Sequence, residues 1–209
     1  LAEVGAARIG EREILALGKE VGWDTLDLFV EQWLDYTEKL MIDAVKRMPA
    51  GRATCESKHD PFPNAEEGIP VKATVEVRPG DAMIEIDLRD NPDAYACGLN
   101  LSRACAESNG LISVFNGIPE LIPTNEGAFR RVKIHLREGS TVGGVSHPTS
   151  CSVATTNLAD RVGNSVARAL AAIVDGYGMA STGSIIPPAV GVISGTSAKT
   201  RGPYVNQIF

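Results

Sequence analysis

Two stretches of this chain have the apolar spacing of long amphipathic α-helices, and they enclose stretches with the spacing of β-strands. Between residues 24 and 48, apolar side chains recur every three or four residues from Leu26 to Met48, and Pro49-Ala50-Gly51 ends the pattern. Residues 156–175 repeat this periodicity and end before Gly176. Each helix has an apolar stripe that needs a partner, so we expect both to bury that stripe against a shared core.

A weaker helical pattern precedes the first long helix. Residues 11–20 place Ile14, Leu15 and Leu17 on one side, and Gly22 marks a break before the next helix. Two adjacent helices of this kind form a pair that packs on another part of the protein. We assign residues 1–50 to this helical pair.

Alternation with a period of two begins after the helical pair. Residues 71–78 and 83–88 alternate apolar and polar side chains around Pro79-Gly80-Asp81, which predicts an antiparallel hairpin with one face in water. Residues 131–137 alternate in the same way and predict another half-exposed strand. Helical spacing at residues 102–114 predicts a helix before it, and the β-branched and aromatic residues of 204–209 predict a further strand.

Hairpins followed by helices, rather than strict strand-helix alternation, indicate an α+β fold of antiparallel hairpins packed with long amphipathic helices. A parallel α/β sheet is the alternative. We treat residues 51–209 as one mixed α+β core and residues 1–209 as a single segment. The chain lacks an initiator Met and its last residues read as a strand with no turn signal after it, so we expect it to be part of a larger subunit.

Charge and composition argue against several classes of protein. A net charge of −6 and a pI near 5.1 do not suit a nucleic-acid-binding surface, which needs clustered Lys and Arg. No apolar run reaches the roughly 18 residues of a membrane span, and no signal segment opens the chain. Cysteines at 55, 97, 105 and 151 lack the CxxC spacing of zinc sites, and a chain of this size needs no disulfides. We expect a soluble, cytoplasmic protein with reduced thiols.

Several polar groups have both a functional and a structural interpretation. His59-Asp60-Pro61 contains two kinds of metal ligand, but ordinary turn chemistry explains it as well. His135 lies on the wet side of its predicted strand. Glu85 and Asp87 share one strand face and could act together as acid and base, although the wet face of a hairpin also explains them.

Two further segments are stronger candidates. His147 lies in the glycine-rich loop 138–148, the kind of segment that presents catalytic groups. Thr155 or Thr156 can cap the second long helix, and the free amides of its first turn, helped by Arg161, could hold a carboxylate or phosphate. Capping alone is the alternative, because every helix start needs partners for its N–H groups.

The chain also resembles a known family through a series of short motifs in a fixed order. The resemblance begins in the helical pair, continues through Met83-Ile84-Glu85-Ile86-Asp87 and is densest between residues 98 and 161. The motifs of that stretch are Gly98-Leu99-Asn100-Leu101-Ser102, Pro123-Thr124-Asn125-Glu126-Gly127-Ala128-Phe129-Arg130, Arg137-Glu138-Gly139-Ser140, His147-Pro148 and Thr155-Thr156-Asn157-Leu158-Ala159-Asp160-Arg161. Their order is similar to that of the hydantoinase B/oxoprolinase family. Within it, Leu88-Arg89-Asp90-Asn91-Pro92-Asp93 looks closer to the N-methylhydantoinase B branch than to the carboxylases.

This resemblance implies a division of labour in an ATP-dependent hydrolase of cyclic amides such as hydantoin, N-methylhydantoin or 5-oxoproline. A hydantoinase A-type partner subunit would bind ATP and phosphorylate the substrate, and the B-type subunit would complete the hydrolysis at a divalent metal ion. The family's metal motif is not found here, and His59-Asp60-Pro61 does not match it, so the metal ligands are expected outside this segment. The alternatives are a subunit of an acetone- or acetophenone-type carboxylase and a non-catalytic scaffold module.

The resemblance also selects site residues. Asn100 and Asn125 each lie beside Gly, Pro or Ser and can be explained as turn residues, but both carry the family motifs. We therefore expect catalytic roles for His147 and Asn125. Contacts with the substrate are expected from Asn100, Ser146, Thr156, Asn157 and Arg161.

Overall fold

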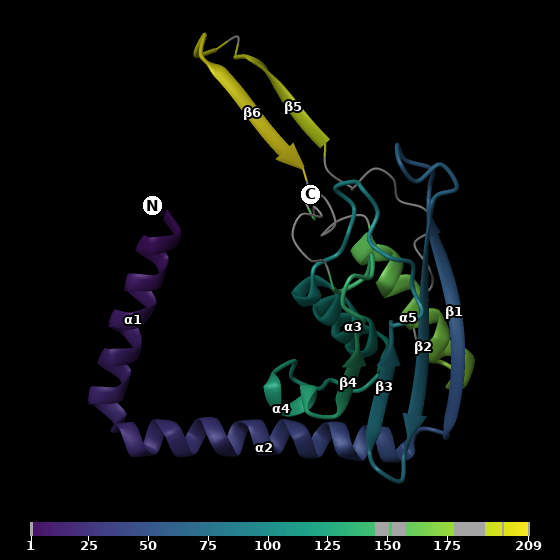
Figure 1. Ribbon diagram of the computed structural model, residues 1–209. Coiled ribbons are helices and arrows are strands. Elements are labelled where there is room, and N and C mark those ends of the chain that lie inside the picture. Colours follow the sequence, from purple (N-terminus) through teal and green to yellow (C-terminus); the bar gives the residue numbers. More distant parts are fainter. Residues whose placement is uncertain (1, 145–150, 152–157, 178–190, 198, 209) are drawn as a thin grey trace.

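The computed structural model describes residues 2–144, 151, 158–177, 191–197 and 199–208 (Figure 1). The five helices of these residues are α1 (Ala2–Val21), α2 (Trp23–Arg47), α3 (Arg103–Gly117), α4 (Glu126–Phe129) and α5 (Leu158–Ile173). The six strands are β1 (Gly51–His59), β2 (Ile69–Arg78), β3 (Met83–Asp87), β4 (Val132–His135), β5 (Gly191–Thr196) and β6 (Pro203–Ile208). The predicted α+β class is confirmed.

The main sheet has four strands in the order β1-β2-β3-β4. The predicted hairpin is present, because β2 and β3 pair antiparallel with Val75 opposite Ile86. β1 pairs antiparallel with β2, whereas β4 pairs parallel with β3, so that Asp87 lies opposite His135. The sheet is therefore mixed, and β1, β3 and β4 all end at the same edge.

One face of this sheet carries the core. Every second residue of β2, from Ile69 to Val77, is buried, and the helices α3 and α5 cover this face with the end of α2 (Figure 1). α5 is also fixed by hydrogen bonds to the sheet: Ser165 Oγ donates to the carbonyl of Val71 at 2.8 Å, and Ser57 Oγ donates to the carbonyl of Arg161 at 2.7 Å. The predicted burial of the apolar face of α5 is confirmed.

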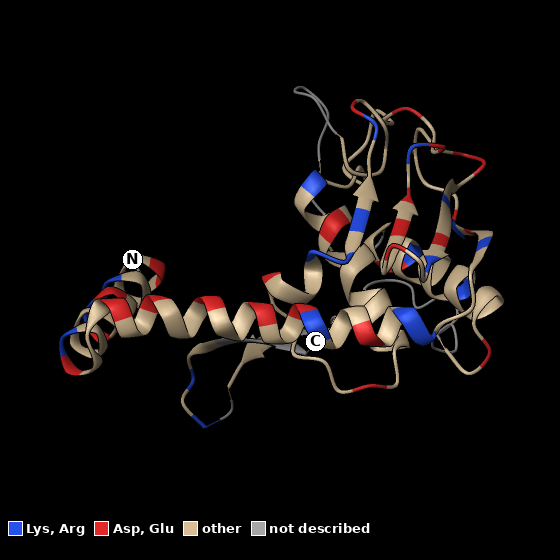
Figure 2. Cartoon of the chain, turned by 90° about the horizontal axis from the view of Figure 1, so that it is seen from below, with Lys and Arg blue, Asp and Glu red and all other residues tan. Residues whose placement is uncertain are grey.

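The helical pair departs from the expectation. Only the second half of α2 is buried, at Thr37, Met41, Ala44 and Val45, and Gly18 is the buried residue of α1. The first half of α2 and the whole of α1 project from the body as an arm (Figures 1 and 2). The prediction that α2 buries its full apolar stripe is therefore wrong for the first half, because no described residue outside the arm covers it.

A second, smaller sheet consists of β5 and β6, which pair antiparallel from Gly191 opposite Ile208 to Thr196 opposite Pro203. It contains the strand predicted at residues 204–209 and extends away from the main body in Figure 1. None of the helices in the described part of the chain combines the length and the apolar character of a membrane span.

Candidate functional site

The face of the main sheet opposite the core is polar and carries a shallow hollow of about 130 Å³. Strand alternation places its lining residues there, since their neighbours in β2 and β3 point into the core. The lining side chains are Arg52, Thr74, Glu76, Glu85, Asp87, Arg89 and His135.

An imidazole and a carboxylate meet in this hollow. Nε2 of His135 lies 3.0 Å from Oε2 of Glu85, and both side chains are half-buried. Arg78 approaches the other carboxylate oxygen, with Nη2 2.5 Å from Oε1. The hydrogen bond from His135 is the main reason why the pKa of Glu85 is lowered; burial opposes it, and the charge of Arg78 adds to it.

Asp87 has a separate partner in the same hollow. Arg89 donates from Nε and Nη2 to the two carboxylate oxygens at 2.9 and 2.7 Å, and its backbone N–H donates to Oδ1 at 3.0 Å. These bonds lower the pKa of Asp87 to about 2, against the opposing effect of burial. Asp87 is therefore a carboxylate throughout the neutral range.

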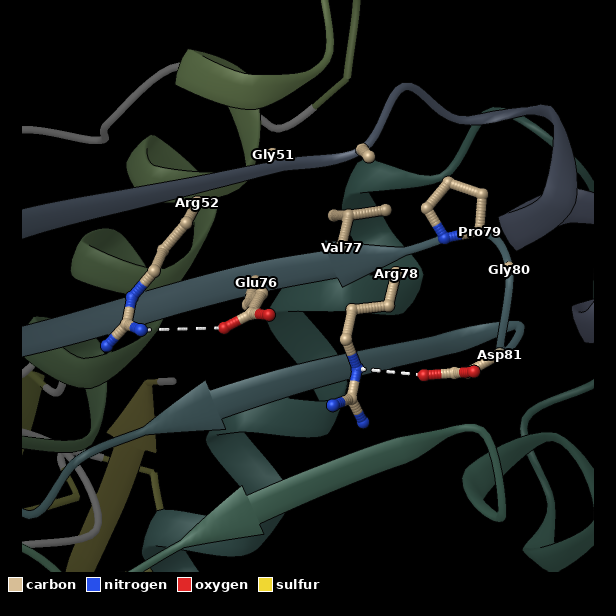
Figure 3. Close-up of a pocket in the computed structure, with 9 residues that line it drawn as sticks. Gly51, Arg52, Glu76, Val77, Arg78, Pro79, Gly80 and Asp81 are labelled. Carbon is tan, nitrogen blue, oxygen red and sulfur yellow. Dashed lines mark ion pairs between the residues drawn. The ribbon is translucent and has the colours of Figure 1, made fainter.

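A wider and more open hollow of about 590 Å³ adjoins the first at the turn between β2 and β3 (Figure 3). Arg52 and Glu76 line both hollows, and Nη1 of Arg52 lies 3.6 Å from Oε2 of Glu76. Arg78 points toward Asp81, with Nε 3.5 Å from Oδ2. The polar face is thus a network of ion pairs within the chain.

The described residues do not fit the divalent metal that the family resemblance implies. Among the residues that the structure describes, Cys151 included, no three His, Cys, Asp or Glu side chains lie close enough to share an ion. His59 is buried, and its Nδ1 lies 2.7 Å from the carbonyl oxygen of Asp60. We therefore derive no chemical step through a metal on these residues.

Asn100, which the sequence marks as a substrate contact, is buried and hydrogen-bonded both within its own loop and to the loop after β4. Its Oδ1 accepts from the N–H of Tyr95 at 2.8 Å and from Oγ1 of Thr141 at 3.2 Å. Its Nδ2 donates to the carbonyls of Tyr95 and Cys97 at 2.8 and 2.9 Å. The side chain joins the loop after β3 to the loop after β4.

Asn125, predicted to be catalytic, is the N-cap of α4. Its Oδ1 accepts from the N–H groups of Gly127 and Ala128 at 3.0 and 3.4 Å. Oγ1 of Thr37 in α2 lies 2.6 Å from the same oxygen. Nδ2 of Asn125 is buried and has no hydrogen-bond partner among the described residues.

The remaining predicted residues divide into two groups. Arg161 is buried in the first turn of α5. Its carbonyl accepts the hydrogen bond from Ser57, so it lies close to the end of β1. Ser146, His147, Thr156 and Asn157 lie outside the described residues. In sequence, all four residues belong to the segment that connects β4 to α5.

The structure brings some of the predicted residues to one edge of the sheet but not all of them. Asn100 bonds to Thr141, beyond the end of β4, and Arg161 lies near the end of β1. Both therefore lie toward the edge where β1, β3 and β4 end. Asn125 precedes the start of β4 and contacts α2, at the opposite edge (Figure 1).

Sequence reasoning did not join Glu85, Asp87 and His135 into one cluster. The alternation of each strand places each group on a wet face. The parallel pairing of β3 with β4 brings the three together, and this pairing joins strands that are distant in sequence. Alternation carries no signal for this pairing, because it assigns each side chain to a face but does not specify which strands lie side by side.

Comparison with known proteins identifies the family. Residues 1–208 match the model of the hydantoinase B/oxoprolinase family. A protein of Pseudomonas sp. (strain NS671), named as the B-type subunit of a D-/L-hydantoinase, is 25% identical over 194 residues, which cover 88% of this chain and 32% of that protein.

Two solved structures share the fold. The ATP-dependent caprolactamase from Pseudomonas jessenii matches with a TM-score of 0.75 and 20% identity, over 98% of this chain and 34% of that chain. The nucleotide-free structure of an acetone carboxylase matches with a TM-score of 0.59 and 14% identity, over 93% of this chain and 27% of that chain. The chain thus spans about a third of the length of these relatives. Because the family match extends over almost every residue, the chain belongs to the hydantoinase B/oxoprolinase family.

Proposed function

We propose that this chain is part of the B-type subunit of an ATP-dependent hydrolase that opens cyclic amides. The family match over residues 1–208 carries the proposal. Two further findings support the choice of substrate class: the relative named as the B-type subunit of a hydantoinase and the fold shared with a caprolactamase. Hydantoin, N-methylhydantoin and 5-oxoproline are the substrates of this class that we propose.

The need for ATP follows from the chemistry of the amide. Resonance between nitrogen and carbonyl makes the amide bond stable toward water. Phosphorylation of the carbonyl oxygen by a hydantoinase A-type partner would remove that resonance and leave carbon open to attack. A divalent metal held outside this segment would supply an activated water.

Within this chain, we propose that the segment between β4 and α5 supplies groups that act on the substrate. It contains Ser146, His147, Thr156 and Asn157, the expected catalytic and binding groups. The hydrogen bonds of Asn100 hold the loop from which this connection starts, and α5, where it ends, is fixed to β1 and β2. Asn100 and Arg161 would then position the connection.

We assign Asn125 a positioning role through α4, because its Oδ1 already serves the start of α4 and Thr37. We also favour a structural role for the hollow around His135. Its charged groups are paired within the chain, as Glu85 with His135 and Asp87 with Arg89, so a substrate would have to displace these partners.

A carboxylase subunit is the second candidate function. The fold match to an acetone carboxylase is the observation that favours it, with the lower of the two TM-scores. A scaffold role without chemistry is the third candidate.

A phosphate-release assay on the full enzyme complex separates the hydrolase from the carboxylase. The complex receives ATP together with hydantoin, N-methylhydantoin, 5-oxoproline, or a ketone with bicarbonate. We expect substrate-dependent phosphate release with at least one cyclic amide and none with the ketone. Release with the ketone alone would establish the carboxylase instead.

A further inference from the structure

The apolar stripe of α2 is continuous, but only half of it is covered. Residues 26, 30, 33, 37, 41, 44 and 48 follow one another at three- and four-residue intervals, so they share one face of the helix. Thr37, Met41 and Ala44 are fully buried against the body. On the same face one to two turns earlier, Val30 is 47% exposed and Trp33 is 43% exposed.

Aromatic side chains widen the uncovered part of the stripe. Phe29 and Trp33 stack with ring centroids 6.5 Å apart, and Trp33 and Tyr36 stack at 5.7 Å. All three rings are exposed. A contiguous exposed aromatic surface of this kind marks an interaction site, and stacked aromatic residues are typical anchors of an interface.

α1 adds a second apolar surface to the arm. Its exposed apolar side chains are Val4, Ile9, Ile14, Leu15, Leu17 and Val21. Trp23 packs directly against Gly18, where a Cβ would meet the indole ring at 2.5 Å, so the bend between the helices is held by this contact. Most of the stability of a helix in a protein comes from packing of its apolar face rather than from helix propensity. α1 therefore needs more cover than α2 alone gives it.

The opposite side of α2 is acidic. Asp24, Asp27, Glu31 and Asp35 are exposed. Acidic residues, drawn red, recur along this helix in Figure 2. Asp35 and Glu38 pair with Arg130 beside α4, at 3.2 and 2.8 Å. The arm is thus amphipathic, with one face suited to water and one suited to burial.

We propose that the stripe formed by Leu26, Phe29, Val30, Trp33 and Tyr36 docks on the rest of a hydantoinase B-type subunit. The matched relatives are about three times as long as this chain, which covers 32% and 34% of two of them. The fold match to the caprolactamase takes in 98% of this chain, so it includes nearly all of the arm. The stripe also continues a surface that is already buried within the same chain. This inference rests on family membership and not on the reaction proposed above.

Cysteine labelling in the full subunit tests the docking. Val30→Cys puts a thiol on the stripe, and the matched control Glu31→Cys puts one on the acidic face one residue later. Peptide mass spectrometry separates these labels from those on the four native cysteines, which are all partly buried. Both positions are exposed in this chain, so neither variant should prevent folding.

We expect the thiol at position 30 to react at least about tenfold more slowly than the thiol at position 31 in the dilute, monomeric subunit. Equal rates would overturn the proposal. Protection that appears only when the subunit dimerises would assign the stripe to a second copy. Protection that appears only when the ATP-binding partner is added would assign it to that partner. Either of these two outcomes would show that the stripe does not dock on the rest of its own subunit. The labelling rates are measured without any assay of catalytic activity.

Discussion

Oγ1 of Thr37 lies 2.6 Å from Oδ1 of Asn125, which is 88 residues later in the chain. The same asparagine oxygen accepts from the first amides of α4, so one atom caps a helix and joins it to another. The Asn125 motif that carries the family resemblance thus has a structural task at the junction of α2 and α4.

Replacing Asn125 with Ala should lower the free energy of unfolding by about 1–2 kcal/mol, the usual cost of losing an N-cap. Thr37→Val should cost about 1 kcal/mol. The double variant should lose less than the sum, because both changes remove the same contact. Urea unfolding measures all three. Asn116→Ala, at an exposed position of α3, serves as the control, and strict additivity would contradict the assigned link.

Gly127 lies where α4 approaches the backbone of α2. A Cβ at this position would collide with the carbonyl oxygen of Leu34, which a helix cannot easily move. Gly127→Ala should therefore destabilise the chain by about 1–3 kcal/mol. Gly80→Ala is the matched control, since a Cβ added at Gly80 would have no atom within 4 Å. A stable Gly127→Ala variant would show that the two helices are not in close contact.

Stability should fall at acid pH through Asp87. Its pKa is about 2 in the folded chain and 3.8 ordinarily, so the folded state favours the carboxylate. This contribution is complete above the ordinary pKa and disappears as the pH falls through the folded pKa. Between pH 4 and pH 2, Asp87→Asn should lose less stability than the wild type, as measured by thermal unfolding. If the stability of the wild type and of the Asp87→Asn variant changed with pH in the same way, the assigned ion pair between Asp87 and Arg89 would be wrong.

His147 and Asn100 should respond differently to substitution in the full enzyme. His147→Ala should lower turnover by about 100-fold or more, the contribution of a general acid or base, with little effect on stability. Asn100→Ala should lower stability by about 1–3 kcal/mol, because its buried partners would lose their hydrogen bonds. His135→Gln is the control for His147 and should keep turnover within a few-fold. If it lost activity instead, the hollow on the open sheet face would be the catalytic site.

Sequence predicts well the helices and strands whose apolar residues recur with the period of the element, because this recurrence marks the buried face. α5 and the β2–β3 hairpin have clear apolar faces, and both are found. β1 is not predicted, because Ala53, Cys55 and Ser57, which face α5, are small or polar and do not alternate visibly with their neighbours. α4 has only four residues, too few for a periodic signal.

Nonlocal relationships are the other part that sequence does not predict. The parallel pairing of β3 with β4, which creates the hollow at His135, depends on strands separated by α3 and α4. Periodicity predicts the apolar stripe on α2 correctly, but it does not reveal that half of the stripe is uncovered in this chain. For the candidate site, sequence supplies residue types, and only the fold places Asn100 and Asn125 at opposite edges.

The most direct test of the central claim is the stoichiometry of the full complex. Ring-opened product and inorganic phosphate are counted in the same reaction with a cyclic amide and ATP. We expect both to form together, only with ATP, and neither to form with the 209-residue chain alone. Ring opening without ATP, or ATP-dependent carboxylation of a ketone in place of ring opening, would contradict an ATP-dependent cyclic-amide hydrolase.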